Sequence, residues 1–218
     1  MRREQLVTTE RVVDETGRRD VVNVLHVTYE REKHWVSDPD SQFPAPDLDR
    51  SDISWFVARV WNRPVGVLRM LYDPPIHLYA QYRFELLDPT IRVEDFIDRP
   101  GMAEVGRFAV LPGNRGQIMI AAALMRAATI EALERNCTHL LTDVFEDDPH
   151  SPYRFHTRVL GFRPVATHDV GELNSSSRRI TLLLDMSAAY KRLRKRGHWL
   201  YRYLTDQLPD TLHDRLAA

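Results

Sequence analysis

The 218-residue sequence predicts a mixed α/β fold built around one sheet, with a prominent strand–helix–strand unit in its centre. Two observations support this prediction. The composition is ordinary for a globular chain, with 43% hydrophobic and 28% charged residues. Within residues 103–145, a buried strand leads into a long Ala-rich helical pattern and then into a second strand. Such a crossover is right-handed and joins parallel neighbours, so these two strands should run in the same direction.

Before this unit, we expect one helix, one loop and two strands. Residues 4–20 hold short apolar pairs around a turn signal at residues 14–17. Apolar positions three or four residues apart favour a helix over residues 21–36, although its β-branched first half would also suit a strand. Residues 37–52 carry three prolines and five aspartates, which is typical of a loop. Strands follow at residues 54–61 and 65–72, and a proline-bearing insertion occupies residues 73–100.

After this point, the sequence predicts the rest of the sheet and a helical C-terminus. The expected elements are strands at 103–111, 139–145, 163–167 and 178–185, helices at 118–133 and 152–160, and one or two helices beyond Ser187, a predicted N-cap. Gly161 should close the 152–160 helix as a left-handed C-cap. We expect one domain over residues 1–186, with residues 187–218 as its C-terminal helical extension. Core positions are expected at Trp55, Phe56, Trp61 and Cys137.

Composition argues against several classes of function. The formal net charge of −1 gives no whole-chain case for nucleic acid or an acidic membrane. Because the chain has one cysteine and its histidines lack HxxxH or HExxH spacing, we expect no disulfide and no metal. No signal peptide and no run of about 18 uncharged apolar residues occurs, which predicts a cytoplasmic protein without a membrane span.

The turn after strand 103–111 is the most informative segment. It runs through Pro112-Gly113-Asn114-Arg115-Gly116 directly into the helix. Backbone N–H groups at a helix N-terminus form an anion site, which would suit a pyrophosphate or a phosphopantetheine phosphate. A plain strand-to-helix turn is the alternative that these residues leave open.

The wider context resembles a known family. The strand, the Arg115-Gly116 turn, the Ala-rich helix and the later Leu160-Gly161-Phe162 resemble the acyl-donor core of GNAT acyltransferases, over about residues 54–185. This resemblance implies the GNAT acyl-CoA N-acyltransferase fold. Ile118 and Ile120 stand where the family has small residues and would crowd a pyrophosphate. Coenzyme A would then bind less snugly, or the donor would lack its adenosine diphosphate portion, as the phosphopantetheine of an acyl carrier protein does.

Four shorter motifs resemble the acyl-homoserine-lactone synthases and the related N-acyl amino acid synthases. They are Tyr29, Arg31 and Trp35 in the first helix, the pair Asp47 and Asp49, Gly66-Val-Leu-Arg69, and Glu104-Val-Gly-Arg107. The aspartates are closer together than in a lactone synthase, which favours the N-acyl amino acid synthase side.

The resemblance also implies roles. Glu104 would take the proton from the acceptor amine, Arg107 would orient it or hold a carboxylate, and Tyr153 would protonate the leaving thiol. Acceptor binding is expected from Arg31, Trp35, Asp47, Asp49 and Arg69. Donor binding is expected from Phe108, Ala109, Val110, Arg115, Gly116 and Gln117. Residues three apart on a regular strand face opposite ways, so Glu104 and Arg107 can share a pocket only through a bulge, for which Gly106 is a natural place.

Plainer interpretations stay open. The aspartates would also serve as turn formers in the Pro-rich loop, and Arg69 as a solvated strand residue. Glu104 and Arg107 would also fit a pair facing opposite ways without a common pocket, and Tyr153 would also fit a packing role.

The C-terminal region is locally basic. From residue 178 to residue 196, seven Lys or Arg residues stand against one acid. We predict that Arg192, Arg194, Lys195 and Arg196 dock a partner, with Trp199, Tyr201 and Tyr203 close by. Acyl carrier proteins are acidic and suit such a patch, a tRNA would suit it too, and a solvated helix face is the alternative.

Taken together, the resemblance implies an N-acyltransferase without a tightly bound cofactor. It would move an acyl group from an acyl-carrier-protein or coenzyme A thioester to the amine of an amino acid or related small metabolite. One alternative is a transferase that uses aminoacyl-tRNA, and another is a catalytically silent GNAT-fold binding domain. The altered glycine loop favours the silent domain, whereas the retained Glu104 and Arg107 favour the enzyme.

Overall fold

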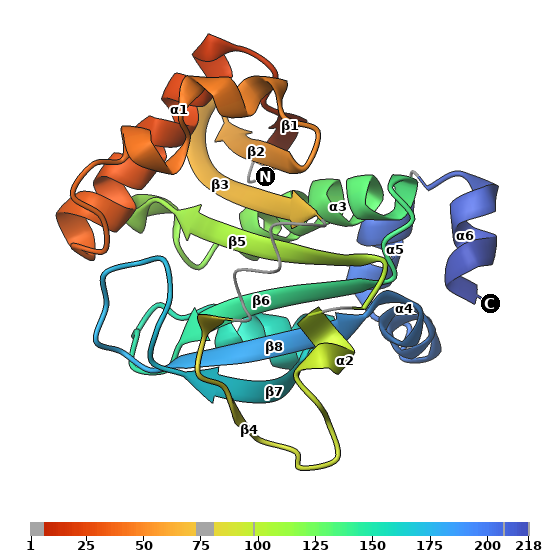
Figure 1. The fold of residues 1–218 in the computed structure, drawn as a ribbon. Helices are drawn as coiled ribbons and strands as arrows, with labels where there is room; N and C mark the ends of the chain where they lie inside the picture. The colour runs from red at the N-terminus through yellow and green to blue at the C-terminus, as the bar shows by residue number, and fades with distance from the viewer. Residues whose placement is uncertain (1–6, 73–80, 98, 207, 218) are drawn as a thin grey trace. The chain divides into compact units, whose positions relative to one another are not determined.

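The computed structural model confirms the mixed α/β fold over the residues it describes, which are 7–72, 81–97, 99–206 and 208–217 (Figure 1). The strands are β1 (Val7–Arg11), β2 (Ile53–Val60), β3 (Arg63–Tyr72), β4 (Glu85–Leu86), β5 (Met102–Val110), β6 (His139–Phe145), β7 (Arg163–His168) and β8 (Arg179–Asp185). The α-helices are α1 (Glu15–Leu25), α2 (Glu94–Ile97), α3 (Ile118–Glu134), α4 (Met186–Lys195), α5 (Trp199–Thr205) and α6 (Asp210–Ala217). Two π-helices, η1 (His26–Glu32) and η6 (Phe155–Leu160), and three 3-10 turns, η2 (Asp40–Gln42), η3 (Ala45–Asp49) and η5 (Pro112–Asn114), complete the elements.

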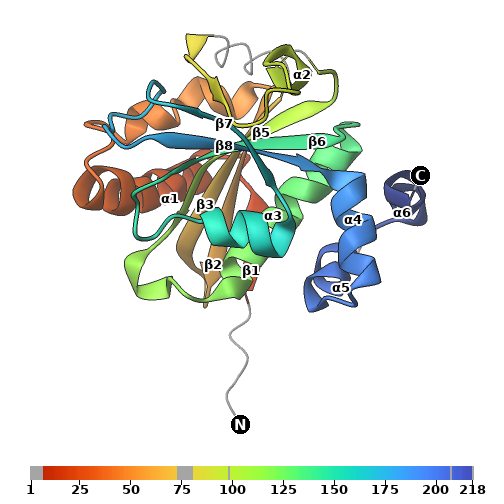
Figure 2. The same cartoon turned by 90° about the horizontal axis from the view of Figure 1, so that it is seen from below.

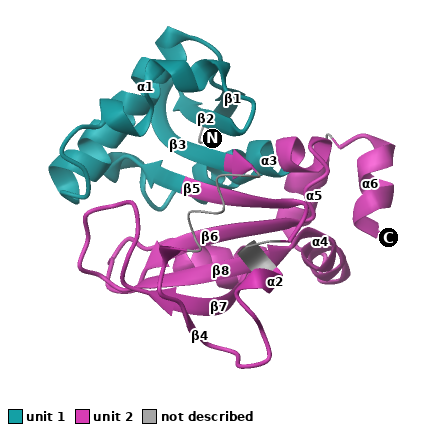
Figure 3. Cartoon of the chain, viewed as in Figure 1, with its two compact units in different colours: residues 1–70, 107–129 teal, residues 71–106, 130–218 magenta. Residues whose placement is uncertain are grey.

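Within the described residues, the strands follow the order β1-β2-β3-β5-β6-β8-β7-β4. As predicted, β5 and β6 are parallel, joined by α3, whereas β6 and β7 each pair antiparallel with β8. The chain divides into two compact units, and the division falls inside β3, β5 and α3 (Figure 3). Unit 1 comprises residues 1–70 and 107–129, and unit 2 comprises residues 71–106 and 130–218.

The first helix of unit 1 begins earlier than predicted. Asp14 is its N-cap and accepts a hydrogen bond from the Gly17 amide at 2.8 Å, so the expected turn is the start of α1. The helical region then continues as the π-helix η1 instead of reaching residue 36 as one α-helix. An extra residue per turn shifts the side chains at the end of this region relative to an α-helix.

Close packing in unit 1 explains one glycine. A Cβ on Gly66 would lie 3.1 Å from the Ala109 carbonyl oxygen and 3.1 Å from Ile120 Cγ2, so only glycine lets β3, β5 and α3 approach this closely. Trp55 and Phe56 are buried as predicted, but the prediction for Trp61 is wrong. Trp61 is 59% exposed because it forms, with Asn62, a two-residue hairpin turn in which both residues have positive φ.

In unit 2, the sheet is covered on both faces. Figure 2 shows η6 on one face of β6, β8 and β7 and the segment 81–97 on the other. The second face carries a core of Met102, Leu141, Val165, Ala166 and Leu183, against which Tyr82, Phe84, Ile91 and Val93 pack. Cys137 is buried, as expected of a small apolar side chain.

Gly161 ends η6 with φ 97°, which confirms the predicted left-handed C-cap. The Arg192 guanidinium fills the space beside it and donates to the Val159 and Leu160 carbonyls at the end of η6. A Cβ on Gly161 would overlap this guanidinium, so both the backbone conformation and the contact require glycine.

The C-terminal region differs from the prediction in two ways. In the described part of this region, three helices follow β8 instead of one or two, and the N-cap of α4 is Asp185 instead of Ser187. Asp185 accepts from the Ala188 amide at 2.9 Å because β8 leads directly into the helix. Ser187 lies inside α4 and donates to the Leu216 carbonyl of α6 at 2.9 Å. Among the described residues, no helix has the length and apolarity needed to span a bilayer.

Candidate active site

The strand β5 carries Glu104 and Arg107, two of the three residues predicted to be catalytic. Its parallel register with β6 pairs Met102–Glu104 with His139–Leu141. Arg107 then has φ 48°, a left-handed conformation that is rare for a residue with a side chain. Gly106, where the sequence suggested a bulge, does not have a positive φ, and the unusual backbone conformation belongs to Arg107 instead. Glu104 and Arg107 are both buried, with 8% and 9% of their surface exposed.

In unit 2, Glu104 belongs to a face of the sheet that also carries polar groups. It follows Met102 by two residues and lies opposite Leu141, and both of these belong to the core on that face. Asp143, two residues beyond Leu141, accepts a hydrogen bond from the Thr181 hydroxyl at 2.7 Å and lies 3.2 Å from His168 Nε2. Asp143 thus supplies a structured carboxylate on this face.

In unit 1, Arg107 is held by a residue that the sequence did not single out. Arg107 Nε donates to Gln42 Oε1 at 2.9 Å. The two residues are 65 positions apart, and Gln42 lies in the Pro-rich stretch predicted to be a loop, so no local pattern links them. Gln42 ends η2 and thereby fixes the orientation of the guanidinium.

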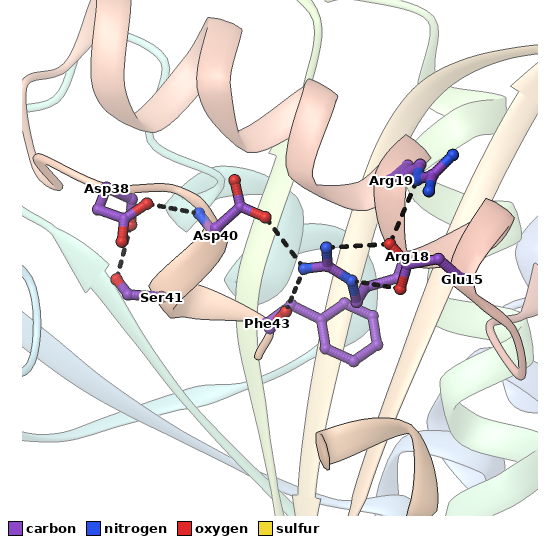
Figure 4. A network of polar contacts seen from close by, with 7 residues as sticks. All are labelled: Glu15, Arg18, Arg19, Asp38, Asp40, Ser41 and Phe43. Carbon is purple, nitrogen blue, oxygen red and sulfur yellow. Dashed lines mark hydrogen bonds and ion pairs between the residues drawn. The ribbon is translucent and has the colours of Figure 1, made fainter. Parts of the chain in front are cut away.

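A network around Arg18 anchors the segment that carries Gln42 (Figure 4). Arg18 of α1 donates to Asp40 Oδ1 at 3.1 Å and to the Phe43 carbonyl at 2.9 Å, and Glu15 holds its Nε at 2.7 Å. The Phe43 ring stacks on Trp55 with centroids 4.8 Å apart. The loop is therefore fixed on both sides of Gln42, which gives Arg107 a rigid support.

The donor turn contains an ion pair that no sequence motif indicates. Arg115 Nη1 and Nη2 each lie 2.6 Å from an oxygen of Glu32, and Nε donates to the Val110 carbonyl at 3.2 Å. Gly116 has φ 83°, and a Cβ built there would meet nothing within 4 Å, so the turn is open on that side. Glu32 stands in the helix that carries Arg31, but its pairing with a residue 83 positions away leaves no trace in the sequence.

One expectation about this turn needs correction. Ile118 is 43% exposed and stands at the start of α3, so its crowding of a phosphate stays a prediction. Ile120 is fully buried and packs toward Gly66, so it does not line the turn. Of the donor residues, Ala109 is buried, Phe108, Val110 and Gln117 are half-buried, and Gly116 is exposed.

The predicted acceptor residues of unit 1 fall into two groups. Arg69 on β3 is 7% exposed, which removes the interpretation of a solvated strand residue. Trp35 is half-buried, with its ring edge-on to Tyr29 at 5.1 Å. Arg31 and Asp49 are exposed. Asp47 lies in η3, and its Oδ1 is 3.3 Å from Nη1 of Arg50, the residue that follows η3. The contact of Asp47 supports a turn-forming role at least as well as a ligand role.

The remaining predicted residues lie in unit 2. Tyr153 is half-buried at the start of the helical segment that ends at Gly161. Its carbonyl accepts a hydrogen bond from the Thr157 hydroxyl at 2.8 Å. Arg194, Lys195 and Arg196 are exposed at the end of α4, whereas Arg192 is engaged with the end of η6. Within the described ranges, no three His, Cys, Asp or Glu side chains form a group that could hold a metal.

Comparisons with known proteins identify the family and the fold. The family model of the N-acyl amino acid synthase FeeM matches residues 20–173. The solved structure of FeeM, an N-acyl amino acid synthase from uncultured soil microbes, aligns with TM-score 0.64 and 18% identity, covering 91% of this chain and 98% of that chain. No curated protein sequence gives a match.

Other solved structures with the same fold are acetyltransferases. An aminoglycoside acetyltransferase in complex with coenzyme A aligns with TM-score 0.57 and 16% identity, covering 87% of this chain and 99% of that chain. A ribosomal-protein-alanine N-acetyltransferase from Brucella melitensis aligns with TM-score 0.56 and 15% identity, covering 83% and 99%. The family model spans more than half of the sequence, and these structures share the GNAT fold. This acyltransferase therefore belongs to the FeeM family of N-acyl amino acid synthases.

Proposed function

We propose that the protein moves an acyl group from the phosphopantetheine thioester of an acyl carrier protein to the amine of an amino acid. The observation that carries this proposal is strand β5. This strand carries the buried carboxylate of Glu104 and the buried side chain of Arg107, whose backbone is in the left-handed region. It then leads into the turn that contains Arg115. A general base, an orienting cation and a phosphate-binding turn thus follow one another on one segment of chain.

The proposed reaction is a direct attack without a covalent enzyme intermediate. The acceptor nitrogen attacks the thioester carbon, a C–N bond forms, and Glu104 takes a proton from that nitrogen. Backbone N–H groups of Phe108 to Val110 stabilise the oxyanion that develops on the carbonyl oxygen. The C–S bond then breaks, Tyr153 gives its proton to the departing sulfur so that a thiol leaves, and the proton taken up by Glu104 is returned through solvent to Tyr153. Arg69 or Arg107 holds the carboxylate of the acceptor by paired hydrogen bonds.

The direct test is product formation from defined donors. Purified protein is incubated with a long-chain acyl carrier protein and a mixture of the common amino acids, and products are identified by mass spectrometry. We expect an N-acyl amino acid and one free thiol for each amide formed, with acyl-CoA used less efficiently. A donor mixture treated with ribonuclease should support the same yield. Absence of an amide with the acyl carrier protein donor, or loss of the amide after ribonuclease treatment, would contradict the proposal.

The basic end of α4 is proposed as the docking surface for the acidic carrier protein. Changing Arg194, Lys195 and Arg196 to glutamate should raise KM for the acyl carrier protein about 10-fold or more, because complementary charge speeds association. KM for a short acyl-pantetheine donor should not change. Arg192 is left intact because its guanidinium holds the end of η6. An equal effect on both donors would show that these residues do not dock the carrier.

A further inference from the structure

The arginine of the donor turn is occupied from within unit 1. Both oxygens of Glu32 lie 2.6 Å from the terminal nitrogens of Arg115, and the third nitrogen donates to the Val110 carbonyl at 3.2 Å. The two side chains are only 22% and 27% exposed, so solvent screens this bidentate pair less than a fully exposed one. A donor phosphate that binds Arg115 must therefore displace Glu32 or lie beside its negative charge.

The position of Glu32 suits displacement as well as pairing. It is the last residue of η1, and its carboxylate also lies 4.0 Å from Lys33 Nζ. If the Glu32 carboxylate leaves Arg115, Lys33 is still beside it, so the negative charge is not left without a neighbouring cation. Lys33 in turn lies over the Trp35 ring at 5.6 Å, which ties this charge pair to a predicted acceptor residue.

We infer that Glu32 sets the donor specificity of the turn: it disfavours coenzyme A and admits the single phosphodiester of a carrier-bound phosphopantetheine. This inference rests on the proposed function. Coenzyme A brings a pyrophosphate and a further phosphate, and its repulsion from Glu32 grows with that charge. The pyrophosphate would also need both terminal nitrogens of Arg115, which Glu32 already holds.

The test measures binding of coenzyme A itself by calorimetry at fixed salt, with no reaction involved. We expect Glu32→Gln to bind coenzyme A about 10-fold more tightly than the wild type, because it keeps the shape of the side chain but removes the charge. Glu30→Gln is the matched control. Glu30 lies two residues earlier in η1 and pairs with His26 instead of Arg115, so its replacement should leave the Kd unchanged.

Two further measurements locate the effect. Adding Arg115→Ala to Glu32→Gln should abolish the gain, because the two residues act as one pair. Binding of 4′-phosphopantetheine, which has one phosphate, should gain less than binding of coenzyme A. If Glu32→Gln binds coenzyme A no better than Glu30→Gln, or if neither binds it, the inference is wrong. A failure of amide formation would instead reject the proposed function, since these binding measurements do not depend on turnover.

Discussion

Replacing Glu104 with glutamine lowers kcat by about 100-fold or more, while the protein stays folded. Glutamine keeps the size of the side chain and can still hydrogen-bond, but it cannot accept the proton of the attacking amine. Because Glu104 is 8% exposed, a loss of stability is the competing explanation. Single-turnover rates are therefore measured together with the midpoint of thermal unfolding.

The same change at an exposed position provides the control. Glu134 is exposed at the end of α3, so Glu134→Gln should leave both kcat and the unfolding midpoint unchanged. Wild-type turnover in the Glu104 variant would remove this residue from the mechanism. A variant that fails to fold would instead assign Glu104 a role in stability, and the pH dependence of the wild-type rate would then decide whether a carboxylate acts as base.

Acidification is expected to destabilise the protein through His156. Its ring is fully buried between Phe155 and Phe162, and burial lowers its pKa from 6.5 to about 3. The unfolded chain takes up a proton below pH 6.5, whereas the folded chain does so only near pH 3. Stability from the neutral ring is thus complete above pH 6.5 and falls by up to about 1.4 kcal/mol for each pH unit below it.

Urea unfolding between pH 7 and pH 4 measures this effect as a difference between variants. In His156→Phe, which keeps a ring but cannot titrate, the free energy of unfolding should depend less on pH than in the wild type. His150 is exposed, so His150→Gln should leave the slope unchanged. The slope is informative even if phenylalanine fits the site poorly. Parallel slopes for wild type and His156→Phe would rule out this origin of acid sensitivity.

The sequence predicted local structure well because local signals dominate it. Alternating strand patterns and the Ala-rich run placed β5, α3 and β6 to within one residue, and Gly161 marked a helix end by its conformational freedom. Trp61 was misplaced because spacing along a strand does not reveal where the hairpin turns. Asp14 was taken as a turn residue because the same side chain suits a turn and a helix N-cap.

Contacts between segments far apart in the chain could not be predicted from the sequence. Gln42 and Glu32 have no motif of their own, and each acts on an arginine that only the folded chain brings near. Arg192 was grouped with its basic neighbours because charge alone does not show that one guanidinium is engaged by carbonyls. Motif resemblance identified the family, but the partners of each charged residue had to come from the structure.

At Arg107, the conformation of the backbone and the contacts of the side chain favour different residues. Glycine would adopt φ 48° without the steric cost that a side chain incurs, so conformational preference alone favours glycine over arginine at this position. The buried guanidinium, held by Gln42, is what glycine would remove. A glycine here would relieve the backbone, but it would also leave an empty space in the interior and take away the donor to Gln42 Oε1. Relief of backbone strain and retention of the buried hydrogen bond therefore favour different residues at position 107.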